Sequence, residues 1–327
     1  MEKLEITDRN ETPFRFSLRT GVDLSGKTIL AFGGAGALAE TFLYAAAQCG
    51  AEIAVADYGP PDAGQKPAAS ERLARVARNI ADLGRSTPLV MSGDVTIPSD
   101  VSAVAEAVTD RFGRIDIAVD FAGMHHRTLD LPREDVDEMT ELFRRVIELN
   151  LTGAFVFTAV LGQAMVRQRG GHLIHLCSSA SRASLYGSYA YNASKHGVEG
   201  LVKTAAAQLA PYGVRVNGIA PGTVVTDLNR HLSFAEDGQP MPRAKSILAH
   251  TPTKRFATAE GVAETLLSMC IDQRHLTGNV IFPDDGYAIE GHSWPEGNVA
   301  LYESAAALDA LYTEIDVRYP PHGETGV

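Results

Sequence analysis

The sequence is poor in cysteine, and the few cysteines that it has are scattered. Only Cys49, Cys177 and Cys270 occur in 327 residues, and none belongs to a Cys-x-x-Cys pair. A disulfide framework or a thiolate metal site needs cysteines at characteristic spacings. We therefore expect no metal site and no disulfides. A reducing cytoplasmic location is the simplest that fits this cysteine usage.

The sequence also has fewer basic than acidic residues. The chain has 29 Lys and Arg residues against 40 Asp and Glu, which gives a net charge of −11. Nucleic acids and anionic membrane surfaces attract basic proteins. We therefore expect neither nucleic acid nor a membrane as a partner.

Long apolar runs are missing as well. No run of apolar residues reaches the roughly 20 that a membrane span needs. The first residues, "MEKLEITDRNETPFRF", are charged throughout and lack the apolar core of a signal peptide. The overall composition, with 45% hydrophobic and 21% charged residues, is that of an ordinary globular protein.

Seven short apolar runs are present, and they alternate with amphipathic helical stretches. Such alternation predicts right-handed βαβ units, so we expect an α/β fold. It would be a single Rossmann-type, doubly wound domain with a seven-stranded parallel sheet and helices on both faces. We place this domain at 23–290, after an N-terminal arm at 1–22 and before a C-terminal extension at 291–327. The runs are "KTILAFGG", "GAEIAVADYG", "TPLVMSGDV", "RIDIAVDFAG", "GHLIHLCSS", "GVRVNGIAPG" and "NVIFPDDG".

The stretch "LAFGGAGALAE" joins the first expected strand to a helix, as a dinucleotide-binding loop does. Gly34, Gly36 and Ala39 fit the pattern G-x-G-x-x-G/A, in which the helix N-terminus receives the pyrophosphate. Glycine-rich turns also occur for steric reasons alone, so the loop by itself is a weak signal. Asp57 strengthens it, because it ends the next strand about 20 residues later. An acid there accepts from the ribose 2′-hydroxyl and repels a 2′-phosphate. We therefore expect NAD rather than NADP, although Asp57 could instead only cap a turn.

Tyr191 and Lys195 stand four residues apart in "YNASK", which places both on one face of a helix. A free tyrosine has a pKa of about 10, and a neighbouring ammonium lowers such a pKa. The pair can therefore exchange a proton near neutral pH. A Tyr-x-x-x-Lys spacing also arises by chance on helix surfaces, so the surrounding sequence has to decide.

The sequence around the pair resembles the short-chain dehydrogenase/reductase family, from about Leu24 to Gly286. "GHLIHLCSS" resembles the strand that ends in the family's catalytic serine. "IELNLTGAFVFTAVLGQAM" resembles its asparagine-bearing helix, "VRVNGIAPGTVVTD" its Pro-Gly loop and "LTGNVIFPDDG" its last strand. The resemblance implies Ser178 as the catalytic serine, with Ser179 as the alternative. It implies the catalytic set Asn150, Ser178, Tyr191 and Lys195.

The cofactor loop departs from the family pattern Thr-Gly-x-x-x-Gly-x-Gly, whose positions fall on Phe32, Gly33, Ala37 and Ala39. "DFAG" likewise replaces the usual Asn-Asn-Ala-Gly, in which one asparagine links neighbouring strands. Backbone donors remain in both places, so we still expect cofactor binding. The expected cofactor-binding residues are Gly33, Gly34, Gly36, Ala37, Leu38, Asp57, Asp94, Val95, Ala122, Gly123, Tyr191, Lys195, Pro221, Gly222, Val224 and Thr226.

The resemblance implies an NAD-dependent oxidoreductase that interconverts a secondary alcohol and a ketone. The expected substrate loop, at about 228–256, is basic, and "MHHR" follows "DFAG". We therefore expect a small polar substrate such as a sugar, sugar acid or hydroxy acid. The alternatives are a 3-oxoacyl-thioester reductase, a nucleotide-sugar-modifying relative and a non-catalytic NAD-binding scaffold. The family also implies a homo-oligomer, a tetramer or a dimer, assembled through the "YNASK" helix. Expected substrate residues are His125, His126, Arg127, Ser178, Arg230 and Arg243.

Overall fold

The structure is a computed structural model. The expected arm at 1–22, the Pro/Gly-rich insertion at 58–70 and the extension at 291–327 lie wholly or largely outside the part of the chain that it describes. Parts of the loop at 228–256 also lie outside it. The described residues are 21–58, 69–84, 87–226, 230, 233–235, 238–271 and 275–289.

The seven expected strands form one parallel sheet, which confirms the predicted fold class. The strand order is β3-β2-β1-β4-β5-β6-β7, and every neighbouring pair runs parallel. The strands are β1 (Thr28–Phe32), β2 (Glu52–Asp57), β3 (Leu89–Ser92), β4 (Ile117–Asp120), β5 (Gly171–Leu176), β6 (Val214–Ile219) and β7 (Val280–Ile281).

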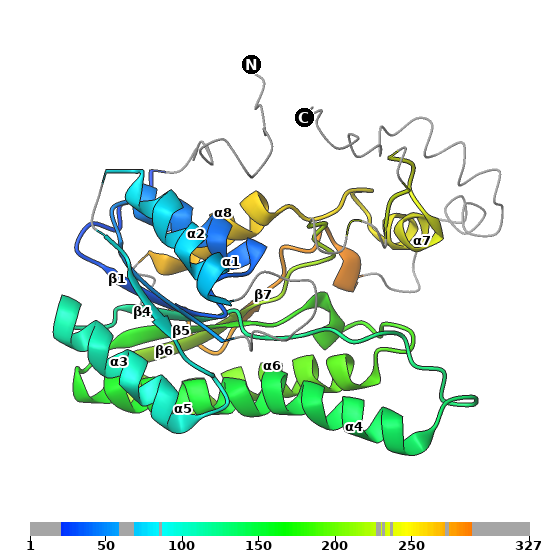
Figure 1. The fold of residues 1–327 in the computed structure, drawn as a ribbon, viewed down its shortest axis with the longest axis horizontal. Coiled ribbons are helices and arrows are strands. Elements are labelled where there is room, and N and C mark those ends of the chain that lie inside the picture. The colour runs from blue at the N-terminus through cyan, green and yellow to red at the C-terminus, as the bar shows by residue number, and fades with distance from the viewer. Residues whose placement is uncertain are drawn as a thin grey trace.

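Helices cover both faces of this sheet (Figure 1). Helices α1, α2 and α8 lie on one face, and α3, α5 and α6 lie on the other, with α4 against α6. The α-helices are α1 (Ala37–Gln48), α2 (Ala69–Ala81), α3 (Pro98–Phe112), α4 (Val136–Ile147), α5 (Gly153–Arg167), α6 (Tyr189–Leu209), α7 (Pro242–His250) and α8 (Ala259–Cys270). The shorter turns are the π-helix η1 (Glu148–Thr152) and the 3₁₀ turns η2 (Ser179–Ser181), η3 (Ala210–Tyr212) and η5 (Tyr287–Ile289).

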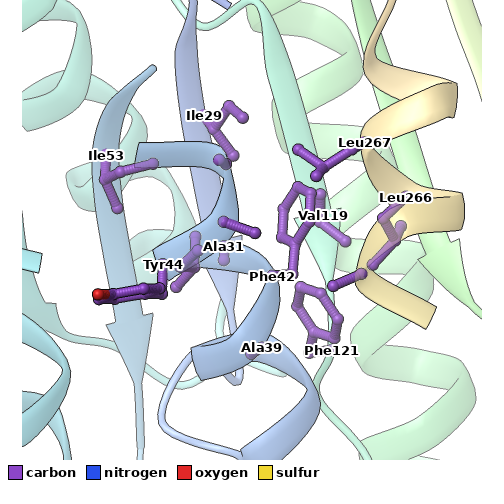
Figure 2. Close-up of a cluster of buried hydrophobic side chains, with 14 of the residues drawn as sticks. Ile29, Ala31, Ala39, Phe42, Tyr44, Ile53, Val119, Phe121, Leu266 and Leu267 are labelled. Carbon is purple, nitrogen blue, oxygen red and sulfur yellow. The ribbon is translucent and has the colours of Figure 1, made fainter. Parts of the chain in front are cut away.

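The core between α1 and α8 explains one departure from the family pattern. Figure 2 shows the rings of Phe42 and Phe121 side by side near Leu266 and Leu267 of α8. The two ring centroids are 5.9 Å apart. Burying an aromatic side chain of this size stabilises a fold by about 1.5–3 kcal/mol. The phenylalanine of "DFAG" therefore fills the core on this face.

Asp120, the other departure in "DFAG", holds the loop after β4 and faces the neighbouring strand β5. Its Oδ1 accepts from the N–H of Ala122 at 3.0 Å. Its Oδ2 faces Nδ1 of His175 on the neighbouring strand β5 at 3.4 Å. A carboxylate thus stands where the family pattern has an asparagine, and it faces the neighbouring strand β5.

Helices α4, η1 and α5 form one continuous helical stretch. By length and composition alone, Val136–Arg167 could cross a membrane, and half of its most apolar window is buried inside the protein. Phe157, Leu161 and Met165 of α5 are fully buried in the core on the second face. Packing against the sheet therefore accounts for the apolar composition of this stretch, which the sequence analysis had not singled out.

The strand order reverses between β1 and β4, because β2 and β3 lie beyond β1 while β5 to β7 lie beyond β4. In open α/β sheets the crevice at the carboxyl ends of the strands beside such a reversal is the usual ligand site. Gly33 follows β1 there and meets Ala122 after β4. The fold thus brings the glycine loop and "DFAG" to one place.

Candidate active site

The glycine loop begins at a residue that has to be glycine. Gly33 has a φ of +68°, and a Cβ there would lie 2.6 Å from the backbone nitrogen of Ala122. A Cβ on Gly34 would lie 2.2 Å from Cγ2 of Val55 on β2. Both glycines are therefore required by close packing of the loop against the strands.

The alanines of the loop are compatible with its geometry. Ala39 is fully buried and points into the core between α1 and α8 (Figure 2). Ala37 is the first residue of α1, and Phe32 is buried on the opposite face against Phe157, with ring centroids 6.0 Å apart. The methyl group of Ala39 therefore adds bulk to the core and not to the loop, which accounts for alanine at this position.

The N-terminus of α1 fits a pyrophosphate group. Its N-cap residue, Gly36, is exposed and makes no side-chain cap, whereas Asp135 caps α4 and Thr258 caps α8. Backbone N–H groups in a first helical turn have no partner within the helix, and the helix dipole favours an anion there. The N–H groups of Ala37 and Leu38 would hold the pyrophosphate of a dinucleotide.

Asp57 lies at the end of β2 beside this loop. Its Oδ2 accepts from the N–H of Ala35, and its Oδ1 accepts from the N–H of Tyr58, each at 2.8 Å. Burial raises the pKa of Asp57, and the bond from Ala35 opposes this effect. The carboxylate is thus fixed where the ribose of a dinucleotide bound to the loop would lie.

Asp94, Val95, Ala122 and Gly123 line the neighbouring strand ends. Oδ1 of Asp94 accepts from both the N–H and the hydroxyl of Thr96, at 2.8 and 2.7 Å. Val95 is buried, and Gly93 donates to the carbonyl of Asp57 at 3.2 Å. These contacts hold the end of β3 next to the end of β2, which is the expected adenine side of the site.

Tyr191 and Lys195 lie on one face of α6, as the spacing predicted. Nζ of Lys195 is 5.8 Å from the centroid of the Tyr191 ring. The ammonium is buried and donates to the carbonyl of Leu176, the last residue of β5, at 2.6 Å. The strand end therefore fixes the charge of Lys195 next to the tyrosine.

Asn150 sits in the π-helix η1, a kind of turn that is frequent at functional sites. Its amide exchanges two hydrogen bonds with the backbone of Met124, at 2.8 and 2.9 Å, and donates to Oγ of Ser194 at 3.1 Å. Gly123 lies between Asn150 and Lys195. A Cβ there would be 3.3 Å from Oδ1 of Asn150 and 3.7 Å from Nζ of Lys195, so glycine keeps this space open.

Ser178 is the N-cap of η2, directly after β5. Its Oγ accepts from the N–H of Ala180 at 3.2 Å, and no hydrogen bond among the described residues uses its hydroxyl proton. Ser179 is buried, and its N–H donates to the carbonyl of Pro221 at 3.0 Å. Both serines therefore remain candidates for the catalytic serine. Burial raises the pKa of the adjacent Cys177 thiol to about 12, which makes Cys177 a poor nucleophile.

The Pro-Gly loop is anchored to the C-terminal part of the described chain. A Cβ on Gly222 would lie 2.9 Å from Cα of Asp284. Val224 forms an isolated parallel bridge with Ala257, and the carbonyl of Thr226 accepts from the N–H of Arg230 at 2.9 Å. These contacts fix the loop beyond β6 that was expected to contact the cofactor.

The expected substrate residues separate in the structure. The ring of His125 lies against that of Tyr191, with centroids 4.6 Å apart, and Nε2 is 3.3 Å from Oγ of Ser188. Burial lowers the pKa of His125, and the charge of Arg243 on α7 lowers it further. His125 is therefore uncharged at neutral pH, and Arg243 lies close enough to act on it.

His126 and Arg127 point elsewhere. Nδ1 of His126 donates to the carbonyl of Arg127 at 2.6 Å, and its Nε2 accepts from the N–H of Tyr191 at 3.4 Å. Both ring nitrogens are thus used inside the protein. The Arg127 side chain is 54% exposed and pairs with Glu134. Both side chains thus have partners within the protein, and their expected role as substrate ligands stays a prediction. Arg230 is buried.

Ser194 and Asn192 are two further residues of the site that were not expected from the sequence. Ser194 is buried, accepts from Asn150 and donates to the carbonyl of Tyr191 at 2.8 Å. Asn192 donates to the carbonyl of Ala183 at 3.0 Å and so holds the loop between η2 and α6. Both lie inside "YNASK", so polar residues between the tyrosine and the lysine were the available signal.

Comparisons with known proteins find relatives of this chain and solved structures with a similar fold. A family model described as enoyl-(acyl carrier protein) reductase matches residues 34–288. The D-threitol dehydrogenase of Mycolicibacterium smegmatis is 32% identical over 288 residues, which are 87% of this chain and 100% of that protein. The 3-oxoacyl-[acyl-carrier-protein] reductase of Thermotoga maritima is 30% identical over 268 residues, 81% and 99% of the two chains. The solved carveol dehydrogenase from Mycobacterium avium, in complex with NAD, is 25% identical with a TM-score of 0.71, over 82% and 100% of the two chains.

The fold and the site define an oxidoreductase that acts on CH–OH groups with a nicotinamide dinucleotide. The chain belongs to the short-chain dehydrogenase/reductase family. The expected family is therefore confirmed, and with it the expected class of enzyme.

Proposed function

We propose that the protein is an NAD-dependent dehydrogenase that interconverts a secondary alcohol and a ketone on a small polar substrate. NAD, when bound, supplies the hydride acceptor at C4 of the nicotinamide. Asp57 supports the choice of NAD, because its fixed carboxylate can accept from ribose hydroxyls and would repel a 2′-phosphate. The relative in complex with NAD supports it as well.

The side chains of the chain then have distinct tasks. Tyr191 takes the hydroxyl proton of the alcohol, or returns it to the ketone in the reverse direction. The ammonium of Lys195, fixed by Leu176, stabilises negative charge on the phenol oxygen. Ser178 donates to the reacting oxygen of the substrate. Asn150 holds Met124 and thereby the loop that carries His125 beside Tyr191.

The observation that carries the substrate class is His125 against the ring of Tyr191, with Arg243 close enough to His125 to act on it. His125, uncharged and against the tyrosine ring, can exchange a hydrogen bond with a second oxygen of the substrate. Arg243 supplies a positive charge at the same mouth. Both side chains are exposed in the structure, and an apolar substrate that covered them would remove their water without supplying a partner, at a cost of about 1–3 kcal/mol for each polar group that it buries. A relative that is a D-threitol dehydrogenase supports the same class.

The test is NAD reduction followed at 340 nm over a panel of polyols, sugars, sugar acids, hydroxy acids and apolar alcohols. We expect the highest kcat/KM for an alcohol with a second oxygen next to the reacting carbon. The relative that is a 3-oxoacyl-[acyl-carrier-protein] reductase favours a second candidate, reduction of a 3-oxoacyl thioester. A thioester with NADPH therefore belongs in the panel. An apolar alcohol as the best substrate would contradict the proposal.

Arg243→Ala is expected to raise the KM for a carboxylated substrate about fivefold, with kcat little changed. An exposed arginine contributes about 1 kcal/mol to such an ion pair. The effect should shrink at high salt, because salt screens exposed charges. Arg127→Ala is the matched control, because Arg127 pairs with Glu134. Equal changes in both variants would show that Arg243 does not face the substrate.

We also propose that the protein is a homo-oligomer. The small residues at 200–210, in the second half of the helix that carries "YNASK", pack partly inside, because Ala205 and Ala206 are buried against the core. The outer surface of α4 and α5 offers apolar side chains instead. Phe155 is 58% exposed, and Phe143 and Val136 are exposed as well. These side chains suit a helix-to-helix contact between two copies.

Phe155→Ser is expected to shift the protein to a smaller assembly. The change removes the largest exposed apolar side chain of α5 without touching the site. The measurement is molar mass by light scattering at micromolar concentration. Tyr212→Ser is the control, because Tyr212 is 56% exposed on η3. A monomeric wild type, or equal masses for the wild type and Phe155→Ser, would contradict the proposed interface.

A further inference from the structure

The helix that carries Tyr191 has an unusual N-terminus. Ser188 is the N-cap residue of α6, and a serine there normally accepts from the second or third N–H of the helix. Ser188 makes no such bond, and its Oγ lies near His125 instead. The N–H of Tyr191, the third residue of the helix, donates to Nε2 of His126 at 3.4 Å. A residue from another loop thus takes over the capping bond.

His126 is held in the orientation that this bond requires. It is only 6% exposed, and its ring stacks on that of His125 with centroids 5.6 Å apart. A carbonyl can only accept, so the 2.6 Å contact with the carbonyl of Arg127 places the proton on Nδ1. Nε2 therefore carries a lone pair directed at the N–H of Tyr191.

The same loop also holds a second catalytic side chain. Met124 stands two residues before His126. Its backbone N–H and carbonyl exchange two hydrogen bonds with the side-chain amide of Asn150. Lys195, by contrast, is anchored separately by Leu176 of β5. The loop at 124–127 therefore makes one of two links between Tyr191 and Asn150. The other runs through Oγ of Ser194, which accepts from Asn150 and donates to the carbonyl of Tyr191.

We propose that His126 is a positioning residue that caps α6 in place of Ser188 and thereby holds Tyr191 in register with the other catalytic groups. A capping bond orders the first helical turn, and the phenol of Tyr191 starts from that turn. Small displacements of a reacting group cost rate more than affinity. Loss of the bond should therefore lower kcat and leave cofactor binding nearly unchanged.

The test compares His126→Leu with His126→Gln, whose amide oxygen can accept the same bond. His196→Gln is the matched control, because His196 is exposed on α6 and, among the described residues, bonds only to its own helix at Asn192. Hydrogen exchange of the Tyr191 amide is measured by NMR in the protein alone. Turnover is measured with the best alcohol of the panel, and the Kd for NAD by fluorescence titration.

We expect the Tyr191 amide to exchange faster in His126→Leu only. The kcat of this variant should fall about tenfold with KM and the Kd for NAD nearly unchanged, and His126→Gln should recover most of the rate. An unchanged kcat in His126→Leu, or a kcat as low in His126→Gln, would overturn the proposal. If His126→Leu does not fold, His126→Gln provides the test. A Tyr191 amide that exchanges fast in His126→Gln while turnover is normal would also overturn the proposal. Amide exchange needs no substrate, so a wrong substrate class leaves this result untouched.

Discussion

Replacing Tyr191 with phenylalanine should reduce turnover by at least about a thousandfold, because only the hydroxyl that exchanges the proton is removed. The ring remains, so its contact with His125 and the backbone bond to His126 persist. The fold and NAD binding should therefore be nearly intact. The measurement combines single-turnover NAD reduction at 340 nm with the Kd for NAD and the melting temperature.

The control for this experiment is Tyr212→Phe, which removes a hydroxyl from an exposed tyrosine on η3. Its turnover should equal that of the wild type. Substantial turnover by Tyr191→Phe would assign the proton transfer to another group. A large loss of NAD binding in that variant would instead point to damage of the cofactor site.

Asp57→Ser should weaken NAD binding by about tenfold to a hundredfold and relax discrimination against NADP. Hydrogen bonds to a charged group contribute about 1.5–3 kcal/mol, and a neutral side chain no longer repels a 2′-phosphate. Burial already raises the pKa of Asp57. Acidification of the wild type should therefore protonate Asp57 before an exposed aspartate and weaken the same discrimination. The effect of the substitution and the effect of acidification are both measured as the ratio of kcat/KM for NAD to kcat/KM for NADP.

Asp82→Asn is the matched control for the lost charge, because Asp82 is exposed just after α2. Its cofactor ratio should be that of the wild type. If the wild type prefers NADP, or if Asp57→Ser leaves the cofactor ratio unchanged, Asp57 does not bind the ribose hydroxyls.

The order of elements was predictable because each strand is a short apolar run bounded by turn residues, and the parallel sheet follows from their alternation with helices. The spacing of Tyr191 and Lys195 and the position of Asp57 at a strand end were also readable, since both depend on local periodicity. These features need no knowledge of distant contacts. The structure accordingly contains all seven expected strands.

The directions of loop side chains were not predictable, because they depend on partners far away in the sequence. His125, His126 and Arg127 are consecutive, yet they point to Tyr191, to the backbone of α6 and to Glu134. The local sequence shows three consecutive hydrogen-bond donors. It does not show in which direction each side chain points. Phe121 departs from the family motif, and the local sequence did not show that Phe42 would pack against it.

The most direct test of the account is hydride transfer from a labelled alcohol. The substrate is the best polyol or hydroxy acid of the panel, carrying deuterium on the reacting carbinol carbon. We predict that NAD reduction at 340 nm slows relative to the unlabelled alcohol and that mass spectrometry finds one deuterium in the NADH formed. Reduction without transfer of the label, or no reduction with any alcohol of the panel, would contradict the account.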